Sequence, residues 1–182
     1  MPTPKVLPPD FFRRDTLKVA KELLGKFVVK AQERDKNLSF LITEVEAYDG
    51  PEDKASHASR GRTPRTEVMF WEGGYFYVYL VYGMHFMLNI VTGAEDYPAA
   101  VLLRGTREVS GPGRLTKQLG VDKSWNKQPV HPDSGLWVED RGVEINDKDI
   151  ITGPRVGVDY AGEIWKNKPF RYIKDLTNRS KI

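Results

Sequence analysis

Apolar and polar residues alternate along much of the chain, which predicts a protein built largely from half-buried β-strands. The stretches 26–31 and 38–48 alternate in this way and are separated by the polar segment "ERDKN", so we expect a β-hairpin there. Three further strands are expected at 74–81, 84–92 and 99–104. Short polar turns between the strands favour a mostly antiparallel sheet.

Helical signals are few. Asp15 is expected to cap a short helix that runs through Leu24, with Gly25 as its stop signal. A Pro/Gly turn should lead into a second short helix within 110–121, followed only by short strands and turns. The segment 49–66 has no apolar period, so we expect a long loop, which in compact domains is usually functional or disordered.

The composition and the absence of known motifs exclude several classes of functional site. The length of 182 residues indicates one domain, and the net charge of +3 does not by itself identify an acidic partner. The sequence has no cysteine, which excludes disulfides, thiol nucleophiles and cysteine-based zinc sites. It also lacks the HExxH, P-loop, GxGxxG and GxSxG motifs. No signal peptide or membrane-spanning run is visible, so we expect a cytoplasmic protein without a membrane partner.

A pair of glutamates stands out in the strand predicted at 38–48. Alternation places Glu44, Glu46 and Tyr48 on one face of this strand. The simpler interpretation is a solvent-exposed strand face. The alternative is that Glu46 is a general base, because a carboxylate beside aromatic and apolar strands is partly desolvated and its pKa rises.

The stretch "GGYFYVYLVYGMHFMLNI" concentrates tyrosines on one strand. Tyr75, Tyr77 and Tyr79 should share one face, while Phe76, Val78 and Leu80 should face the core. The chain then turns at Tyr82-Gly83 and returns with His85, Met87 and Asn89 on one face. A bulky residue at a hairpin tip is typical of wedges that unstack DNA. Aromatic rings that hold a base outside the helix are typical of enzymes acting on bases.

Basic and histidine residues follow in or near the loops. His57 lies in the long loop, where a lone histidine is more often a surface residue or a satisfied polar contact than a catalyst. The basic clusters "RGRTPR" at 60–65 and "RGTR" at 104–107 could be solvated faces or could hold phosphates.

Five segments resemble, in order, the alkyladenine (3-methylpurine) DNA glycosylase family. They are "TEVEAYDGPEDKASH", "MF…GGYFYVYLVYGMHFMLNI", "AAVLLRG", "SGPGRLTKQLGVDKSW" and "RVGVDYAGE". The resemblance runs from about residue 15 to about residue 174. It implies an α+β fold with one catalytic domain over residues 1–182, built on a curved, mostly antiparallel sheet with few helices and a protruding, DNA-inserting β-hairpin.

The same resemblance implies roles for individual residues. Glu46 matches the glutamate that activates the attacking water, and Arg104 and the backbone carbonyl of Val156 match the groups that hold this water. Tyr48, His57 and Tyr79 match the contacts of the flipped base, and Asn89 matches the residue that clashes with the 2-amino group of guanine. Tyr82 matches the intercalating wedge, while Tyr75 and Tyr77 are expected to serve in packing. The residues expected to contact DNA are Tyr82, Met84, Arg60, Arg62 and Arg65.

The implied activity is that of a monofunctional DNA glycosylase. It would flip alkylated or deaminated purines (3-methyladenine, 7-methylguanine, hypoxanthine and ethenoadenine) out of double-stranded DNA and hydrolyse the N-glycosidic bond. We expect a monomer that needs no metal or other cofactor and, without a suitably placed lysine, does not cleave the strand. His85 and Met87 depart from the residues expected beside the hairpin, which leaves the order of lesion preference open.

Two other functions compete with this prediction. A non-catalytic module that stacks single-stranded nucleic acid on tyrosines would explain the aromatic residues and the basic pI of about 9.0. It would leave Glu46 and Arg104 without a role. A small-molecule hydrolase using Glu46 and His57 would leave Tyr82 unexplained.

Overall fold

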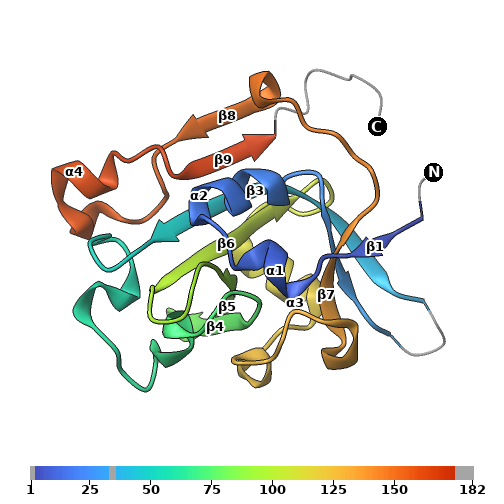
Figure 1. The fold of residues 1–182 in the computed structure, drawn as a ribbon, viewed down its shortest axis with the longest axis horizontal. Coiled ribbons are helices and arrows are strands. Elements are labelled where there is room, and N and C mark those ends of the chain that lie inside the picture. The colour runs from blue at the N-terminus through green and yellow to red at the C-terminus, as the bar shows by residue number, and fades with distance from the viewer. Residues whose placement is uncertain (1–2, 33–35, 175–182) are drawn as a thin grey trace.

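The computed structural model describes residues 3–32 and 36–174, which form a nine-stranded antiparallel sheet with four short helices around it (Figure 1). The strands are β1 (Lys5–Val6), β2 (Phe27–Lys30), β3 (Leu38–Asp49), β4 (Phe76–Val81), β5 (His85–Val91), β6 (Ala99–Thr106), β7 (Leu136–Asp140), β8 (Ile150–Gly153) and β9 (Arg171–Lys174). The helices are α1 (Pro9–Phe12), α2 (Thr16–Leu23), α3 (Pro112–Leu119) and α4 (Gly162–Lys166). The predicted α+β class is therefore confirmed.

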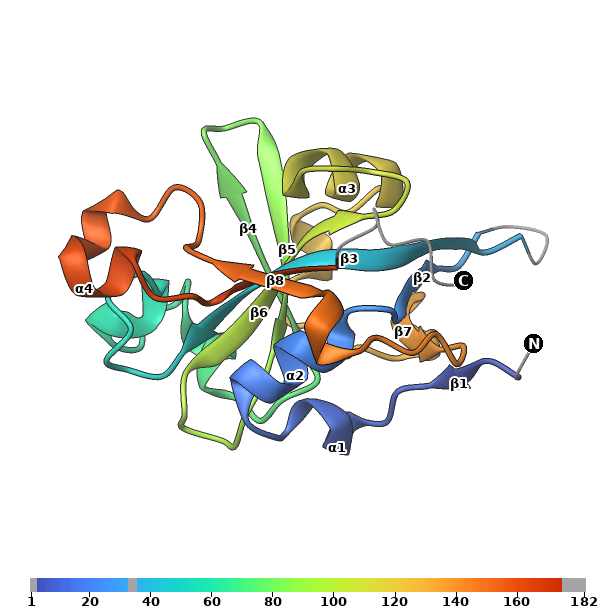
Figure 2. The ribbon, with the colours of Figure 1, turned by 90° about the horizontal axis from the view of Figure 1, so that it is seen from above.

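The sheet curls because its longest strand, β3, pairs with different strands along its two halves. The strand order is β1-β7-β2-β3-β6-β5-β4, and β8 joins through β9, which also pairs with β3. The first part of β3 pairs with β2, and the part from Ile42 onward pairs with β6. Register shifts between Ile42 and Val45 mark an irregularity there, and such bulges bend a strand and increase its twist. Figure 2 shows the result: β2 and β3 run across the view, whereas β4 and β5 rise steeply.

Helix α2 packs against the sheet as its sequence predicts. Asp15 accepts a hydrogen bond from the backbone N–H of Lys18 at 2.8 Å, which caps the helix. Gly25 follows with a φ of 81°, a conformation that glycine adopts without the steric cost of a Cβ. The face carrying Val19, Ala20 and Leu23 is fully buried in the main core. None of the helices described in residues 3–32 and 36–174 is long and apolar enough to cross a bilayer.

Several elements differ from the predictions. Helix α4 was expected as turns, but five residues are too few for a helical apolar period to show. Leu80 was expected to face the core, yet it is 46% exposed because it lies near the free end of β4, beyond the core. The predicted hairpin of β2 and β3 is confirmed, although residues 33–35 of its turn lie outside the described part of the chain. The long loop at 49–66 contains a 3₁₀ turn at His57–Arg60.

Candidate active site

Glu46 lies in the C-terminal half of β3, between two neighbouring strands. Its backbone is opposite Leu102 of β6 on one side and Arg171 of β9 on the other, and its side chain has no exposed surface. The interpretation of an exposed strand face is therefore wrong. It failed because β9 is more than a hundred residues away in sequence and its pairing with β3 leaves no local signal.

The carboxylate of Glu46 receives two hydrogen bonds. The backbone N–H of Val156 donates to Oε1 at 2.7 Å, and the hydroxyl of Tyr48 donates to Oε2 at 3.0 Å. The Nε of Arg104 lies 3.5 Å from Oε1. These contacts hold both oxygens in fixed positions and leave the group able to ionise although it is buried.

Opposing influences set the proton affinity of Glu46. Burial raises its pKa above the ordinary value for a glutamate, and this outweighs the lowering caused by Arg104, by the N–H of Val156 and by the hydroxyl of Tyr48. A carboxylate with a raised pKa is a stronger base than an exposed one, which suits it to remove a proton from water.

Arg104 is held by a second glutamate that sequence reasoning did not assign to the site. The same Oε1 of Glu44 accepts from the Nε of Arg104 at 2.9 Å and from the Nε of Arg171 at 2.7 Å. Glu44 therefore competes with Glu46 for Arg104. The alternation that places both glutamates on one face was the available signal, but the role of Arg171 was hidden by its distance in sequence.

Val156 contacts Glu46 through a different backbone group from the one expected. The resemblance assigned its carbonyl to the water site, whereas the contact in the structure is the N–H donated to Glu46. The role of the carbonyl stays a prediction. The side chain of Val156 is exposed and borders the cleft above Glu46.

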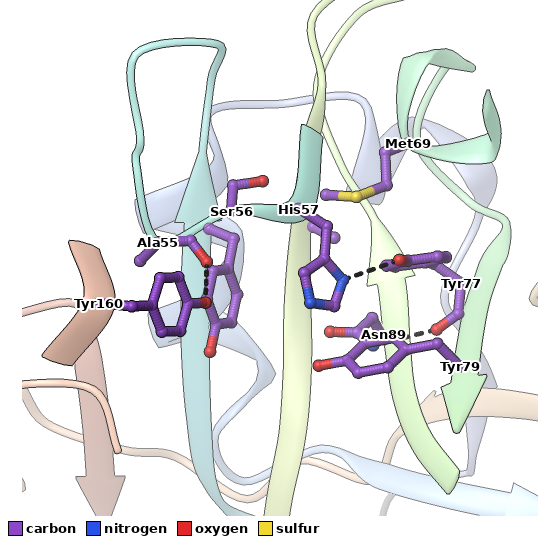
Figure 3. A pocket seen from close by; sticks show the side chains of 10 residues that line it. Ala55, Ser56, His57, Met69, Tyr77, Tyr79, Asn89 and Tyr160 are labelled. Carbon is purple, nitrogen blue, oxygen red and sulfur yellow. Dashed lines mark hydrogen bonds between the residues drawn. The ribbon is translucent and has the colours of Figure 1, made fainter. Parts of the chain in front are cut away.

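The aromatic cavity in Figure 3 is lined in part by Tyr48, whose hydroxyl donates to Glu46. The space between its walls, including the part open to solvent, is about 300 Å³. Tyr160 lies on one side, and His57, Tyr77, Tyr79 and Asn89 lie on the other. The cavity lining also includes Tyr48, Ala55, Ser56, Met69 and Ala100. The four residues expected to contact the base, Tyr48, His57, Tyr79 and Asn89, thus come together.

His57 is fixed in this cavity by a tyrosine that was expected only to pack. Its Nδ1 lies 2.9 Å from the hydroxyl of Tyr77, and its ring centroid lies 4.6 Å from that of Tyr79 in an edge-to-face arrangement. Burial, followed by the charge of Arg65, lowers the pKa of His57 to about 4, so the ring is neutral at physiological pH. Tyr77 also pairs directly with Asn89 across β4 and β5, and its carbonyl accepts from the Asn89 side chain at 3.0 Å.

A wider cleft leads from Glu46 to the hairpin of β4 and β5. Glu46, Arg104, Val156 and Tyr82 all border this cleft, together with cavity residues Tyr48, His57, Tyr79 and Tyr160. At the turn of the hairpin, the N–H of Met84 donates to the carbonyl of Val81 at 3.1 Å. Tyr82 is 88% exposed and Met84 72% exposed.

The backbone at the hairpin turn is strained. Tyr82 and Gly83 have φ values of 52° and 68°. Positive φ at both central positions is what type I′ hairpin turns require, and a tyrosine rarely adopts it. An exposed aromatic side chain in an unfavourable conformation is not explained by stability and points to a function of the exposed ring.

The three arginines predicted to contact DNA lie in different environments. Arg60, Arg62 and Arg65 are all exposed. Arg62 forms an ion pair with Asp96 and lies 4.7 Å from the ring centroid of Phe70, whereas Arg65 lies 5.3 Å from that of Tyr79. Arg65 is thus beside the cavity, whereas the guanidinium of Arg62 is already paired with the carboxylate of Asp96. Among residues 3–32 and 36–174, no group of three or more His, Asp or Glu side chains is arranged to hold a metal ion.

A family model and several relatives assign this chain to the same protein family. A family model described as methylpurine-DNA glycosylase matches residues 10–177. The DNA-3-methyladenine glycosylase of Arabidopsis thaliana is 41% identical over 86% of this chain and 66% of its own length. Relatives from Psychrobacter cryohalolentis and Myxococcus xanthus, both provisionally named 3-methyladenine DNA glycosylases, are 39% and 41% identical. These matches cover 92% and 96% of this chain, and 91% and 93% of the relatives. The chain therefore belongs to the methylpurine-DNA glycosylase family, whose members are hydrolases of N-glycosyl bonds.

Proposed function

We propose that this protein is a monofunctional DNA glycosylase that flips alkylated or deaminated purines out of duplex DNA and hydrolyses the N-glycosidic bond with a water activated by Glu46. The observation that carries the proposal is a fully buried carboxylate at the junction of an aromatic cavity and a cleft that leads to an exposed tyrosine. The flipped purine would enter the cavity between Tyr48 and His57, which places its sugar near Glu46.

In the proposed reaction, Glu46 removes a proton from a water molecule as the water oxygen attacks C1′ of the deoxyribose. The C1′–N bond breaks and its electron pair leaves with the base, so the products are an abasic site and a free purine. The transition state resembles an oxocarbenium ion, and the developing positive charge is stabilised by the negative charge that Glu46 carries before it takes the proton. Arg104, held by Glu44, would orient the water.

Charged and neutral lesions differ in whether the base must be protonated as it leaves. 3-Methyladenine and 7-methylguanine carry a formal positive charge and leave easily, so one carboxylate suffices. Hypoxanthine and ethenoadenine are neutral and require protonation as they leave. Normal purines would be rejected because undamaged pairs cost more to unstack, by a few kcal/mol at most, and because Asn89 obstructs the 2-amino group of guanine.

The exposed side of the site is proposed to bind the duplex. Tyr82 would insert between stacked bases, with Met84 beside it, and Arg60 and Arg65 would contact phosphates. The protein is further proposed to act as a cytoplasmic monomer without a cofactor. A single-strand binding module would not need a buried glutamate next to an arginine, and a nucleoside hydrolase would not need the strained exposed Tyr82.

The proposal is tested with duplex oligonucleotides that each carry one lesion: hypoxanthine, ethenoadenine or 7-methylguanine. We expect the protein to release the free base and to leave a strand that breaks only after treatment with hot alkali. An undamaged duplex and a lesion in single-stranded DNA are the controls. Release of no base from any lesion duplex would refute the catalytic proposal, and strand cleavage without alkali would refute the monofunctional assignment.

A further inference from the structure

A buried ion pair lies directly behind the aromatic cavity. The guanidinium of Arg155 contacts the carboxylate of Asp53 through both terminal nitrogens, at 2.5 Å and 2.8 Å, and neither side chain has any exposed surface. Such two-pronged contacts between arginine and a carboxylate fix both groups in orientation as well as in distance. Neither residue lines the cavity or the cleft. We refer to Arg155 and Asp53 as the buried pair.

Arg155 contacts both strand β3 and helix α4. Its Nη1 donates to the carbonyl of Ala47 in β3 at 2.9 Å, and its Nη2 donates to the carbonyl of Trp165 in α4 at 3.3 Å. Its Cζ lies 4.8 Å from the ring centroid of Tyr48. The guanidinium therefore lies over the ring of Tyr48, while Arg155 itself lines neither the cavity nor the cleft.

Asp53 organises the loop on the other side of the pair. Its two carboxylate oxygens accept the backbone N–H groups of Asp49 at 3.0 Å and Ala55 at 3.1 Å. The carbonyl of Ala55 in turn accepts from the hydroxyl of Tyr160 at 2.8 Å. The chain continues from this loop into His57. The buried pair therefore joins the loop that carries His57 to the segment that carries Val156.

Both hydrogen-bond donors of Glu46 belong to residues that Arg155 holds. Val156 follows Arg155 in the chain, so its N–H is placed by the anchored backbone. Tyr48, whose hydroxyl donates to the other oxygen of Glu46, has its ring supported by the guanidinium. We propose that Arg155 and Asp53 are positioning residues that keep the Val156 N–H and the Tyr48 hydroxyl on Glu46. This inference rests on the proposed function, in which Glu46 is the base.

Stability alone does not explain the buried pair. An ion pair in a protein interior is often no more stabilising than apolar side chains of the same volume, because both charges lose their hydration. The Nε of Arg155 is also buried without a hydrogen-bond partner among the described residues, which is a further cost. A role in placing neighbouring groups accounts for an arrangement that stability does not favour.

The pH dependence of the reaction separates positioning from a general loss of structure. The groups around Glu46 that carry charge or titrate are Glu44, Arg104, Arg171, Tyr48, Tyr79 and Tyr160. The buried pair makes no direct contact with Glu46. Because the Val156 N–H and the Tyr48 hydroxyl both favour the ionised form, loss of either bond raises the pKa of Glu46. The acidic limb of the rate profile would then move to higher pH.

The experiment compares three variants of the buried pair with one matched control. Asp53→Asn and Arg155→Lys each break the two-pronged contact. Asp53→Leu combined with Arg155→Met removes both charges, so that neither is left buried without a partner. Asp149→Asn is the control, since Asp149 also forms a buried ion pair, with Lys174 at 3.6 Å, and borders neither the cavity nor the cleft. Each protein is assayed for thermal unfolding, for affinity to undamaged duplex, and for single-turnover base release from pH 5 to 9.

We expect the variants of the buried pair to release base about 10- to 100-fold more slowly than wild type. The acidic limb should move up by about one pH unit, the effect of losing one hydrogen bond to a charged group. Affinity for undamaged duplex should stay within about twofold of wild type, because no phosphate contact is changed. Asp149→Asn should lower the unfolding temperature without changing the rate or its pH profile.

Three outcomes would contradict either the positioning role or the proposed function. If the single variants do not fold, the double variant is used to test the positioning role. A folded variant of the buried pair with the wild-type rate and pH profile would overturn the positioning role while leaving the proposed function intact. A rate loss with an unchanged pH profile would also overturn it. A wild-type protein that releases no base would instead overturn the proposed function.

Discussion

Glu46 is surrounded by groups that act on its pKa in opposite directions. Burial raises the pKa, while Arg104, the Val156 N–H and the Tyr48 hydroxyl lower it. The balance depends on Glu44, which accepts the Nε of Arg104 at 2.9 Å and keeps that nitrogen 3.5 Å from Glu46. Glu44 thus limits how far Arg104 can stabilise the ionised form of the base.

Replacement of Glu44 should therefore change the pKa of Glu46 in a predictable direction. In Glu44→Gln, Arg104 loses its charged partner and can pair more fully with Glu46, which lowers the pKa of Glu46. Glu46 then stays ionised to lower pH, so the acidic limb of the rate profile should move to lower pH. The rate at neutral pH should fall by less than about tenfold, because a weaker base removes the proton less effectively.

Single-turnover base release across pH measures this effect. Glu139→Gln is a suitable control, because Glu139 also pairs with an arginine, Arg141, and borders neither the cavity nor the cleft. A limb that stays in place or moves to higher pH in Glu44→Gln would show that Glu44 does not restrain Arg104.

At the scale of elements, the hairpin of β4 and β5 joins the cavity to the exposed turn. Tyr77 and Tyr79 face the cavity from one end of β4, and Tyr82 extends from the other end into solvent. The same strand would therefore both bind the base and reach the duplex. The strained φ of Tyr82 indicates that the turn is not optimised for folding.

Exchange of the tip residue should separate stability from binding. Tyr82→Asn creates the Asn-Gly pair that type I′ turns favour, so the free energy of unfolding should rise by about 1 kcal/mol. Affinity for a duplex carrying one hypoxanthine should fall by about tenfold, since an inserted aromatic ring contributes about 1–3 kcal/mol of stacking. Tyr82→Phe retains the ring and should keep the wild-type affinity. Equal affinities for all three proteins in an equilibrium binding assay would exclude the wedge.

At the scale of the whole molecule, the exposed arginines at positions 60–65 should contribute to the salt dependence of DNA binding. Arg60 is exposed, whereas Arg62 is paired with Asp96. Arg60→Ala should reduce the slope of log affinity against log salt by about 0.9, the value for one lost phosphate contact. Arg62→Ala should change the slope less. Equal slopes for both variants and wild type, measured on undamaged duplex, would place the phosphate contacts elsewhere.

The parts of this architecture that local sequence determines were predictable. Helix α2, the hairpin of β2 and β3, and strands β4, β5 and β6 follow from capping residues and period-2 alternation, whereas the two-residue strand β1 was not predicted. The resemblance to a known family brought together Glu46, Arg104 and the cavity residues. The contacts of Glu44 with Arg171 and of Asp53 with Arg155 were not predictable, because they join residues more than a hundred positions apart. Tyr77 was predicted to pack, and its hydroxyl contact with His57 became visible only in the folded cavity.

The role of Glu46 as the base is tested by the variant Glu46→Gln. Glutamine keeps the shape of the side chain and can still accept the N–H of Val156, but it cannot take a proton from water. With enzyme in excess over a 7-methylguanine duplex, we expect base release to fall by at least about 1000-fold while the affinity for the lesion stays within a few fold. If Glu46→Gln releases base at a rate close to that of wild type, Glu46 is not the base.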